Sequence, residues 1–163
     1  MASPLINGRT AALSLQLSQA HNELRRRLAR VRSGLGRRQT GDDSLITHCL
    51  AFCTSLTIHH QGEEEGLFAA LVHERPDLAP TVAKLVADHG FISAILARVR
   101  ELTEQSAGEG GADQEAIGRE LDGLAAIMES HFGYEERALA AALDAGVSDE
   151  DGWTQPVLRF RMP

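Results

Sequence analysis

Aromatic residues and long apolar runs are scarce in this chain. Phenylalanine, tryptophan and tyrosine together make up 4% of the 163 residues. No stretch approaches the roughly 20 apolar residues that a membrane-spanning helix needs, and the first residues contain no apolar run of signal-peptide length. We therefore expect a cytoplasmic protein that has no membrane partner.

Cysteine and basic residues are also few. The two cysteines, Cys49 and Cys53, are one helical turn apart, a spacing that suits reduced thiols better than a disulfide. Lysine and arginine total 16 against 23 aspartates and glutamates, which gives a net charge of -7. Because nucleic-acid binding needs a positive surface, no nucleic-acid partner is expected.

The composition instead favours helices around a single core. Hydrophobic residues make up 43% of the chain, with many leucines and alanines, which is enough for one domain over residues 1–163. Apolar stripes with helical spacing, separated by glycine- and proline-containing breaks, predict an all-α protein. The expected helices cover roughly residues 10–33, 44–75, 80–104 and 113–146, and a tail follows over residues 147–163.

An internal repeat carries the chemistry of the sequence. The motif His59-x-x-x-Glu63 returns near the C-terminal end as His131-x-x-x-Glu135. Residues four apart lie on the same face of a helix, so each copy brings an imidazole and a carboxylate together. Each motif also continues an apolar stripe that steps by threes and fours, which predicts that its side chains point into the core. Because buried charges need a partner, this arrangement indicates a metal site.

The other two expected helices each add one inward histidine. His21 lies on an apolar stripe with Leu17 and Leu24, and His89 lies on another with Leu85 and Ile92. Imidazole and carboxylate ligands without thiolate suit iron or manganese, and helical bundles use such ligands to build two-metal sites. The predicted metal ligands are His21, His59, Glu63, His89, His131 and Glu135.

This order of motifs over four helices resembles the hemerythrin-like family, also called the HHE cation-binding domain. The resemblance covers roughly residues 10–145 and implies an up-and-down antiparallel four-helix bundle with a non-haem di-iron centre. It implies that His21 and His59 bind one iron, that His89 and His131 bind the other, and that Glu63 and Glu135 bridge both. About four protein donors per metal would leave positions for water, an oxo or hydroxo bridge and a small ligand. Manganese or zinc can substitute for iron.

Two positions depart from the oxygen-carrying members of that family. They place a further histidine four residues after the third-helix ligand, where this chain has Ser93, so one metal is short of a protein ligand. They also use an aspartate five residues after the last histidine, where this chain has Glu136. We favour Glu135 as the ligand because position five is rotated by about 140° from the face of that histidine.

Three further residues lie beside the motifs. His60 and Glu64 form a second pair four residues apart, rotated by about 100° from the first. We interpret them as surface residues or as residues that orient the ligands. Tyr134 is expected to pack in the core, although a hydrogen bond in the cavity or a contact with a metal stays open.

The resemblance implies that the small ligand is O2, peroxide or nitric oxide. Because Ser93 leaves both metals open, we predict a protein that senses, scavenges or reduces this oxidant rather than an oxygen store. The alternative is a non-catalytic iron-binding or redox-regulatory module that acts through a partner, and the sequence leaves open whether the protein is an enzyme.

The tail, with Trp153 and Val157, is expected to pack on the bundle or on a second copy of the chain. A second copy of the chain and a redox protein are therefore the candidate protein partners.

Overall fold

The computed structural model describes residues 12–37, 42–109 and 114–159, and its regular elements are all helices. Over those residues the structure contains no strand, which confirms the all-α prediction. The first two residues of the expected first helix, the expected start of the fourth helix at 113 and the two ends of the chain lie outside the described residues. The elements are α1 (Leu13–Arg37), α2 (Asp42–Gly62), the π-helix η2 (Glu63–Leu67), α3 (Phe68–Glu74), the 3-10 helix η3 (Pro76–Leu78), α4 (Ala79–Glu109), α5 (Gln114–Ala145) and α6 (Thr154–Leu158).

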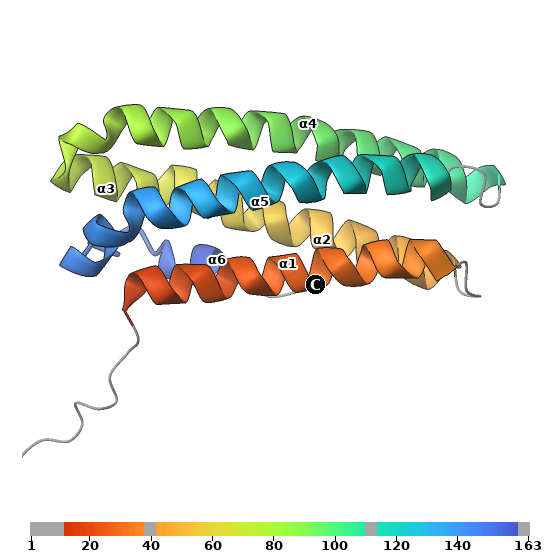
Figure 1. Cartoon of the computed structure of the whole chain (residues 1–163), viewed down its shortest axis with the longest axis horizontal. Coiled ribbons are helices and arrows are strands. Elements are labelled where there is room, and N and C mark those ends of the chain that lie inside the picture. The colour runs from red at the N-terminus through yellow and green to blue at the C-terminus, as the bar shows by residue number, and fades with distance from the viewer. Residues whose placement is uncertain (1–11, 38–41, 110–113, 160–163) are drawn as a thin grey trace, which may run out of the picture.

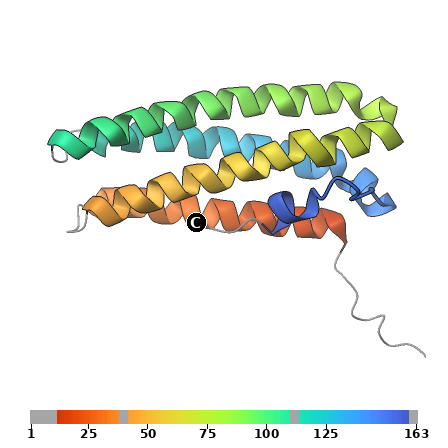
Figure 2. The same cartoon turned by 180° about the vertical axis from the view of Figure 1, so that it is seen from behind.

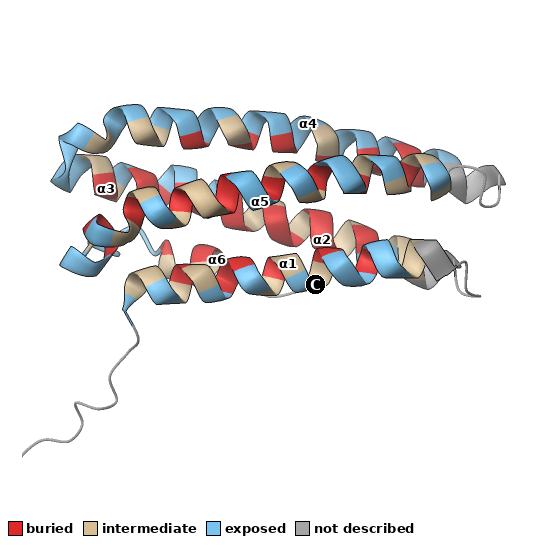
Figure 3. Cartoon of the chain, viewed as in Figure 1, coloured by how far each residue is buried: buried red, intermediate tan, exposed pale blue. Residues whose placement is uncertain are grey.

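The long helices lie side by side in a helical bundle (Figures 1 and 2). Helix α1 packs against α2 and α5, and α4 packs against α5 and α2. Among the described residues, no helix has both the length and the apolar character needed to cross a membrane. The bundle therefore has an inward face on each long helix, as the apolar stripes predicted (Figure 3).

A layer of buried polar residues, which contains the six predicted metal ligands, divides the interior into two apolar clusters. We call it the polar layer. The first cluster includes Leu24, Phe52, Leu56, Ile92, Leu121 and Phe132. The second includes Leu17, Leu67, Leu71, Leu85, Leu139 and Trp153. On each long helix the predicted metal ligands lie between residues of these two clusters, because the apolar stripe continues on both sides of them. The predicted ligands thus form one layer across the bundle.

The expected second helix is interrupted rather than continuous. Residues Glu63–Leu67 form a π-helix, in which each turn holds more residues than an α-helical turn. The interruption begins at Glu63, a predicted metal ligand, and π-turns within helices are frequent at functional sites. The helical conformation then resumes in α3 and ends at Glu74, directly before Arg75 and Pro76.

The C-terminal tail packs over this interruption. Trp153 is 2% exposed and Val157 is fully buried, and α6 contacts α1, α2 and η2. Two glycines allow the close approach: a Cβ at Gly62 would lie 2.8 Å from Cγ of Pro156, and a Cβ at Gly66 would lie 2.6 Å from Cβ of Trp153. The tail therefore packs on the bundle, and it does so at the level of the polar layer.

The substitution Gly66→Ala is expected to destabilise the protein by about 1–3 kcal/mol, because the added methyl group overlaps a buried tryptophan. Chemical denaturation of the metal-free protein measures this loss. Gly123→Ala is the matched control, since a Cβ at this exposed position in α5 meets nothing within 4 Å. It should raise the free energy of unfolding by about 0.5–1 kcal/mol. Equal effects of the two substitutions would contradict the close packing of the tail.

Candidate metal centre

The structure brings the six predicted ligands together in the polar layer. They come from α1, α2, η2, α4 and α5, and each is 3% exposed or less. Two groups of residues in this layer could each hold a metal ion. In the first group, ligand atoms of His60, Glu63, His89 and His131 lie within 4.8 Å of one another. The second group consists of His21, His59 and Glu63, at the same spacing. Glu63 belongs to both groups, so it is placed to contact two metal ions.

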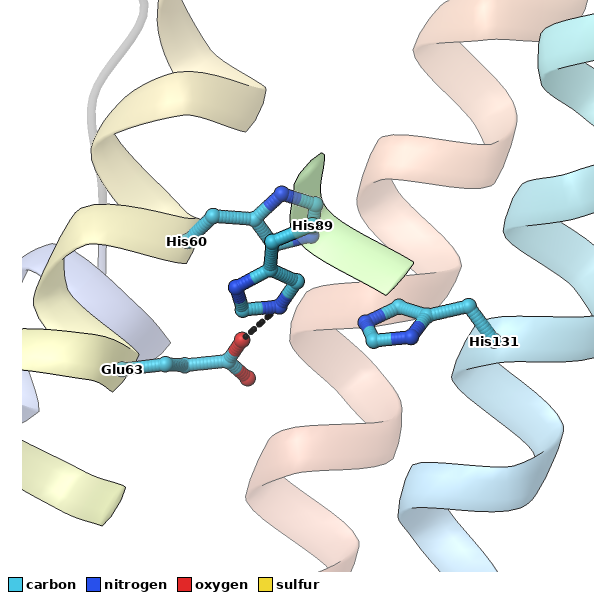
Figure 4. Close-up of side chains that lie close together, drawn as sticks. All are labelled: His60, Glu63, His89 and His131. Carbon is cyan, nitrogen blue, oxygen red and sulfur yellow. Dashed lines mark ion pairs between the residues drawn. The ribbon is translucent and has the colours of Figure 1, made fainter. Parts of the chain in front are cut away.

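The two glutamates lie between histidines of different helices. Oε2 of Glu63 is 3.3 Å from Nε2 of His59, and its Oε1 is 3.1 Å from Nε2 of His89 (Figure 4). Oε1 of Glu135 is 3.4 Å from Nε2 of His131 and 3.7 Å from Nε2 of His21. Each carboxylate thus faces one histidine of each expected metal, the arrangement that a bridging ligand requires.

His60 lies inside the site, so its interpretation as a surface residue is wrong. It is 6% exposed, and its ring stacks on the ring of His89 with centroids 3.7 Å apart (Figure 4). The buried face of α2 is wide enough for adjacent residues, since Phe52 and Cys53 are both buried two turns earlier. Cys53, seven residues before His60, was the sequence signal for this second inward position.

Three carboxylates contact the Nδ1 atoms of histidines in the layer and so orient their rings. Nδ1 of His21 lies 2.7 Å from Glu136, Nδ1 of His89 lies 2.6 Å from Glu64, and Nδ1 of His131 lies 3.0 Å from Asp88. A carboxylate that accepts the Nδ1 proton leaves the lone pair on Nε2, the nitrogen that faces the centre. These contacts are typical of histidines that bind a metal. They also place Glu64 and Glu136 outside the set of inward carboxylates.

The fourth predicted histidine has a different partner. Nδ1 of His59 lies 2.8 Å from the main-chain carbonyl oxygen of Val157, in α6. The tail therefore orients a predicted ligand directly. Sequence reasoning missed this contact because a main-chain acceptor can come from any residue, and it also missed Asp88, which directly precedes His89 in α4.

The inward atoms of the layer have no hydrogen-bond partners of good geometry. They are Nε2 of His21, His60, His89 and His131, and both carboxylate oxygens of Glu63 and Glu135. Buried polar atoms are nearly always satisfied in folded proteins, because leaving them unsatisfied costs free energy. A metal ion would satisfy nitrogen and carboxylate oxygen atoms together, so the donor set fits divalent metal ions such as iron.

Burial controls the charges in this layer. It lowers the pKa of His21 from 6.5 to about 4, and burial together with the neighbouring His89 lowers the pKa of His60 well below its usual value. Burial and the charge of Glu63 raise the pKa of Glu135 well above its usual range. Burial alone would also raise the pKa of Glu63, but His59, Glu135 and His89 together outweigh it and hold that pKa well below the usual range. At neutral pH, His21 and His60 are thus neutral imidazoles, the form that binds metals.

The low pKa of His21 predicts a pH dependence of the metal-free protein. Between about pH 4 and 6.5 the unfolded chain binds a proton at His21 that the folded chain does not bind. The contribution of His21 to the free energy of unfolding is therefore present above pH 6.5 and lost as the pH falls towards 4. From pH 7 to pH 4, His21→Gln should gain about 3 kcal/mol relative to the wild type, at about 1.4 kcal/mol per pKa unit. Urea denaturation at both pH values tests this, and an unchanged difference would contradict the shift.

Other residues singled out from the sequence lie outside the inward set. Ser93 is exposed, so the position that carries a further histidine in the oxygen carriers faces solvent here. Tyr134 packs against the second apolar cluster, and Nζ of Lys84 lies 4.6 Å from its ring centroid. His48 and His73 are exposed. All five other histidines of the chain therefore lie in the polar layer.

The comparisons with known proteins agree with this site. Neither the curated proteins nor the solved structures gave a match. The family model described as the hemerythrin HHE cation binding domain matches residues 14–143, a range that contains all the inward histidines and glutamates but not the tail. The chain therefore belongs to the hemerythrin HHE cation-binding family.

Proposed function

We propose that this protein is a non-haem di-iron protein that binds a small oxidant, O2, peroxide or nitric oxide, and senses, scavenges or reduces it. In this proposal His21 and His59 hold one iron, His89 and His131 hold the other, and Glu63 and Glu135 bridge them. Manganese and zinc are the substitutes that the same donors accept. The proposed fold is an up-and-down antiparallel four-helix bundle over roughly residues 10–145, in one domain that spans residues 1–163 and includes the tail.

The observation that carries the proposal is that Nε2 of His21, His89 and His131 and the carboxylate oxygens of Glu63 and Glu135 are buried in one layer without hydrogen-bond partners of good geometry. Glu63 faces histidines of both groups at 3.3 and 3.1 Å, and the carboxylates behind the histidines hold Nε2 towards the centre. Bound iron would supply the redox chemistry and the positions for the outside ligand. The chain keeps bulk water away from this layer, since the ring of Phe132 stacks on His21 with centroids 3.8 Å apart and the ring of Phe68 lies 5.7 Å from that of His89.

Iron analysis followed by ligand assays tests this function. Protein reconstituted anaerobically with Fe(II) should hold about two irons per chain and should consume peroxide or nitric oxide over many turnovers. The protein with Glu63→Gln is the control that should do neither. Reversible O2 binding through many cycles, without oxidation of the iron, would instead show an oxygen store. A protein that retains no iron would overturn the proposal altogether.

The second candidate is an iron-binding or redox-regulatory module, and the contact between His59 and the tail favours it. Because the carbonyl of Val157 holds a predicted iron ligand, a change at the iron can alter the packing of α6 and thereby the surface offered to a partner. Hydrogen exchange of residues 153–158 in the iron-loaded and iron-free protein separates the two candidates. A large change in protection without turnover of any oxidant would favour the module.

A further inference from the structure

We infer that His60 is a seventh metal ligand, which adds a third imidazole to the metal between His89 and His131. The inference rests on the proposed two-metal function but assigns a residue outside the six-ligand set. It also supplies the protein ligand that was predicted to be missing because position 93 in α4 is a serine. In this assignment, the third histidine comes from α2 instead of α4. The chain thus fills this position from a different helix.

The geometry around His60 carries this assignment. His60, Glu63, His89 and His131 offer ligand atoms that all lie within 4.8 Å of one another, close enough to surround one ion. The ring of His60 is nearly parallel to that of His89, at 17° with centroids 3.7 Å apart, and nearly perpendicular to that of His131, at 85° and 5.4 Å. Three imidazoles that approach from different helices can thus face a common point.

A purely structural histidine would be expected to satisfy its inward nitrogen. Nε2 of His60 is buried and has no hydrogen-bond partner among the described residues. A ring nitrogen of His60 nevertheless lies within 4.8 Å of ligand atoms of Glu63, His89 and His131. If packing alone were required, an apolar side chain would fill the same space without this cost. The unsatisfied nitrogen therefore indicates a ligand role that the stacking on His89 does not explain.

The seventh ligand makes the two metals unequal. With Glu63 and Glu135 bridging, the metal at His60, His89 and His131 has five protein donors, and the metal at His21 and His59 has four. The latter metal has more room for an outside ligand. On this assignment, the metal at His60, His89 and His131 is less open than the absence of a histidine at Ser93 predicted.

Iron stoichiometry of His60→Phe tests the inference. Phenylalanine can keep the stacking on His89 but offers no donor atom, so the variant should hold about one iron per chain. The affinity for the iron between His89 and His131 should fall at least about tenfold. The matched control is His73→Phe, at an exposed histidine of α3, which should keep two irons. Equilibrium dialysis against Fe(II), with metal analysis of the protein, gives both numbers.

The outcomes separate ligation from packing and from the proposed function. Two irons bound to His60→Phe with unchanged affinity would overturn the inference, as would loss of both irons from a folded variant. If His60→Phe does not fold, as judged by circular dichroism, His60→Gln replaces it with the same two criteria. Should the wild-type protein itself bind no iron, the proposed function fails instead.

X-ray absorption of the iron-loaded proteins provides a second readout. Loss of a ligand should lower the average number of imidazoles per iron in His60→Phe but not in His73→Phe.

Discussion

Glu63→Gln is expected to leave the protein without either metal. Glu63 is the residue shared by both ligand groups, and its two oxygens face histidines of two different helices at 3.3 and 3.1 Å. Glutamine keeps the size of the side chain but removes the negative charge and one of the two carboxylate oxygens. Metal analysis after anaerobic reconstitution should find less than about a tenth of the wild-type iron, since both metals lose the ligand that joins them.

The matched control lies in the same π-helix, η2. Glu65 is exposed two residues further along η2, so Glu65→Gln changes the net charge equally without touching the polar layer. It should retain all the iron. A folded Glu63→Gln protein that binds two irons would contradict the bridging role.

Removal of the metal is expected to have the largest effect on the stability of the wild-type protein. A metal ion present at about a thousand times its Kd stabilises the folded state by about 4 kcal/mol. For a chain of 163 residues, this corresponds to a fall in Tm of about 8–16 °C for each metal ion that chelation removes. Among the donors that the metal leaves behind, Nε2 of His21, His89 and His131 and the oxygens of Glu63 and Glu135 are buried and unsatisfied, so the folded structure cannot offset the loss.

Calorimetry before and after treatment with a chelator measures this change. The protein with Glu63→Gln provides the reference, because chelation should leave its Tm unchanged. An equal fall in Tm in both proteins would show that the chelator acts elsewhere. An unchanged Tm in the wild type would show that the polar layer is stable without metal.

Helical periodicity made much of the site predictable from the sequence. His21, His59, His89 and His131 each continue an apolar stripe, and such a stripe must face the core of a bundle. The helix geometry also favoured Glu135 over Glu136, and the structure buries Glu135 while Glu136 contacts Nδ1 of His21. These residues could be found because their placement depends on local spacing.

The remaining features depend on contacts between distant parts of the chain. His60 was missed because a single stripe cannot show that the buried face of α2 is two residues wide at this level. The π-helix at Glu63–Leu67 has no counterpart in a regular spacing of threes and fours. The carbonyl of Val157 that holds His59 is separated from it by 98 positions, and main-chain acceptors leave no mark in a sequence.

The position of Val157 determines when the proposed metal site can be completed during synthesis. Chains leave the ribosome from the N-terminus at about 5–20 residues per second, so the side chains from His21 to Glu135 emerge before the segment that holds His59 in place. The first helices can assemble on the nascent chain, but the surroundings of His59 are complete only after Val157 has emerged. Under the proposed function, loading of iron in its final arrangement would therefore be a late event in biosynthesis.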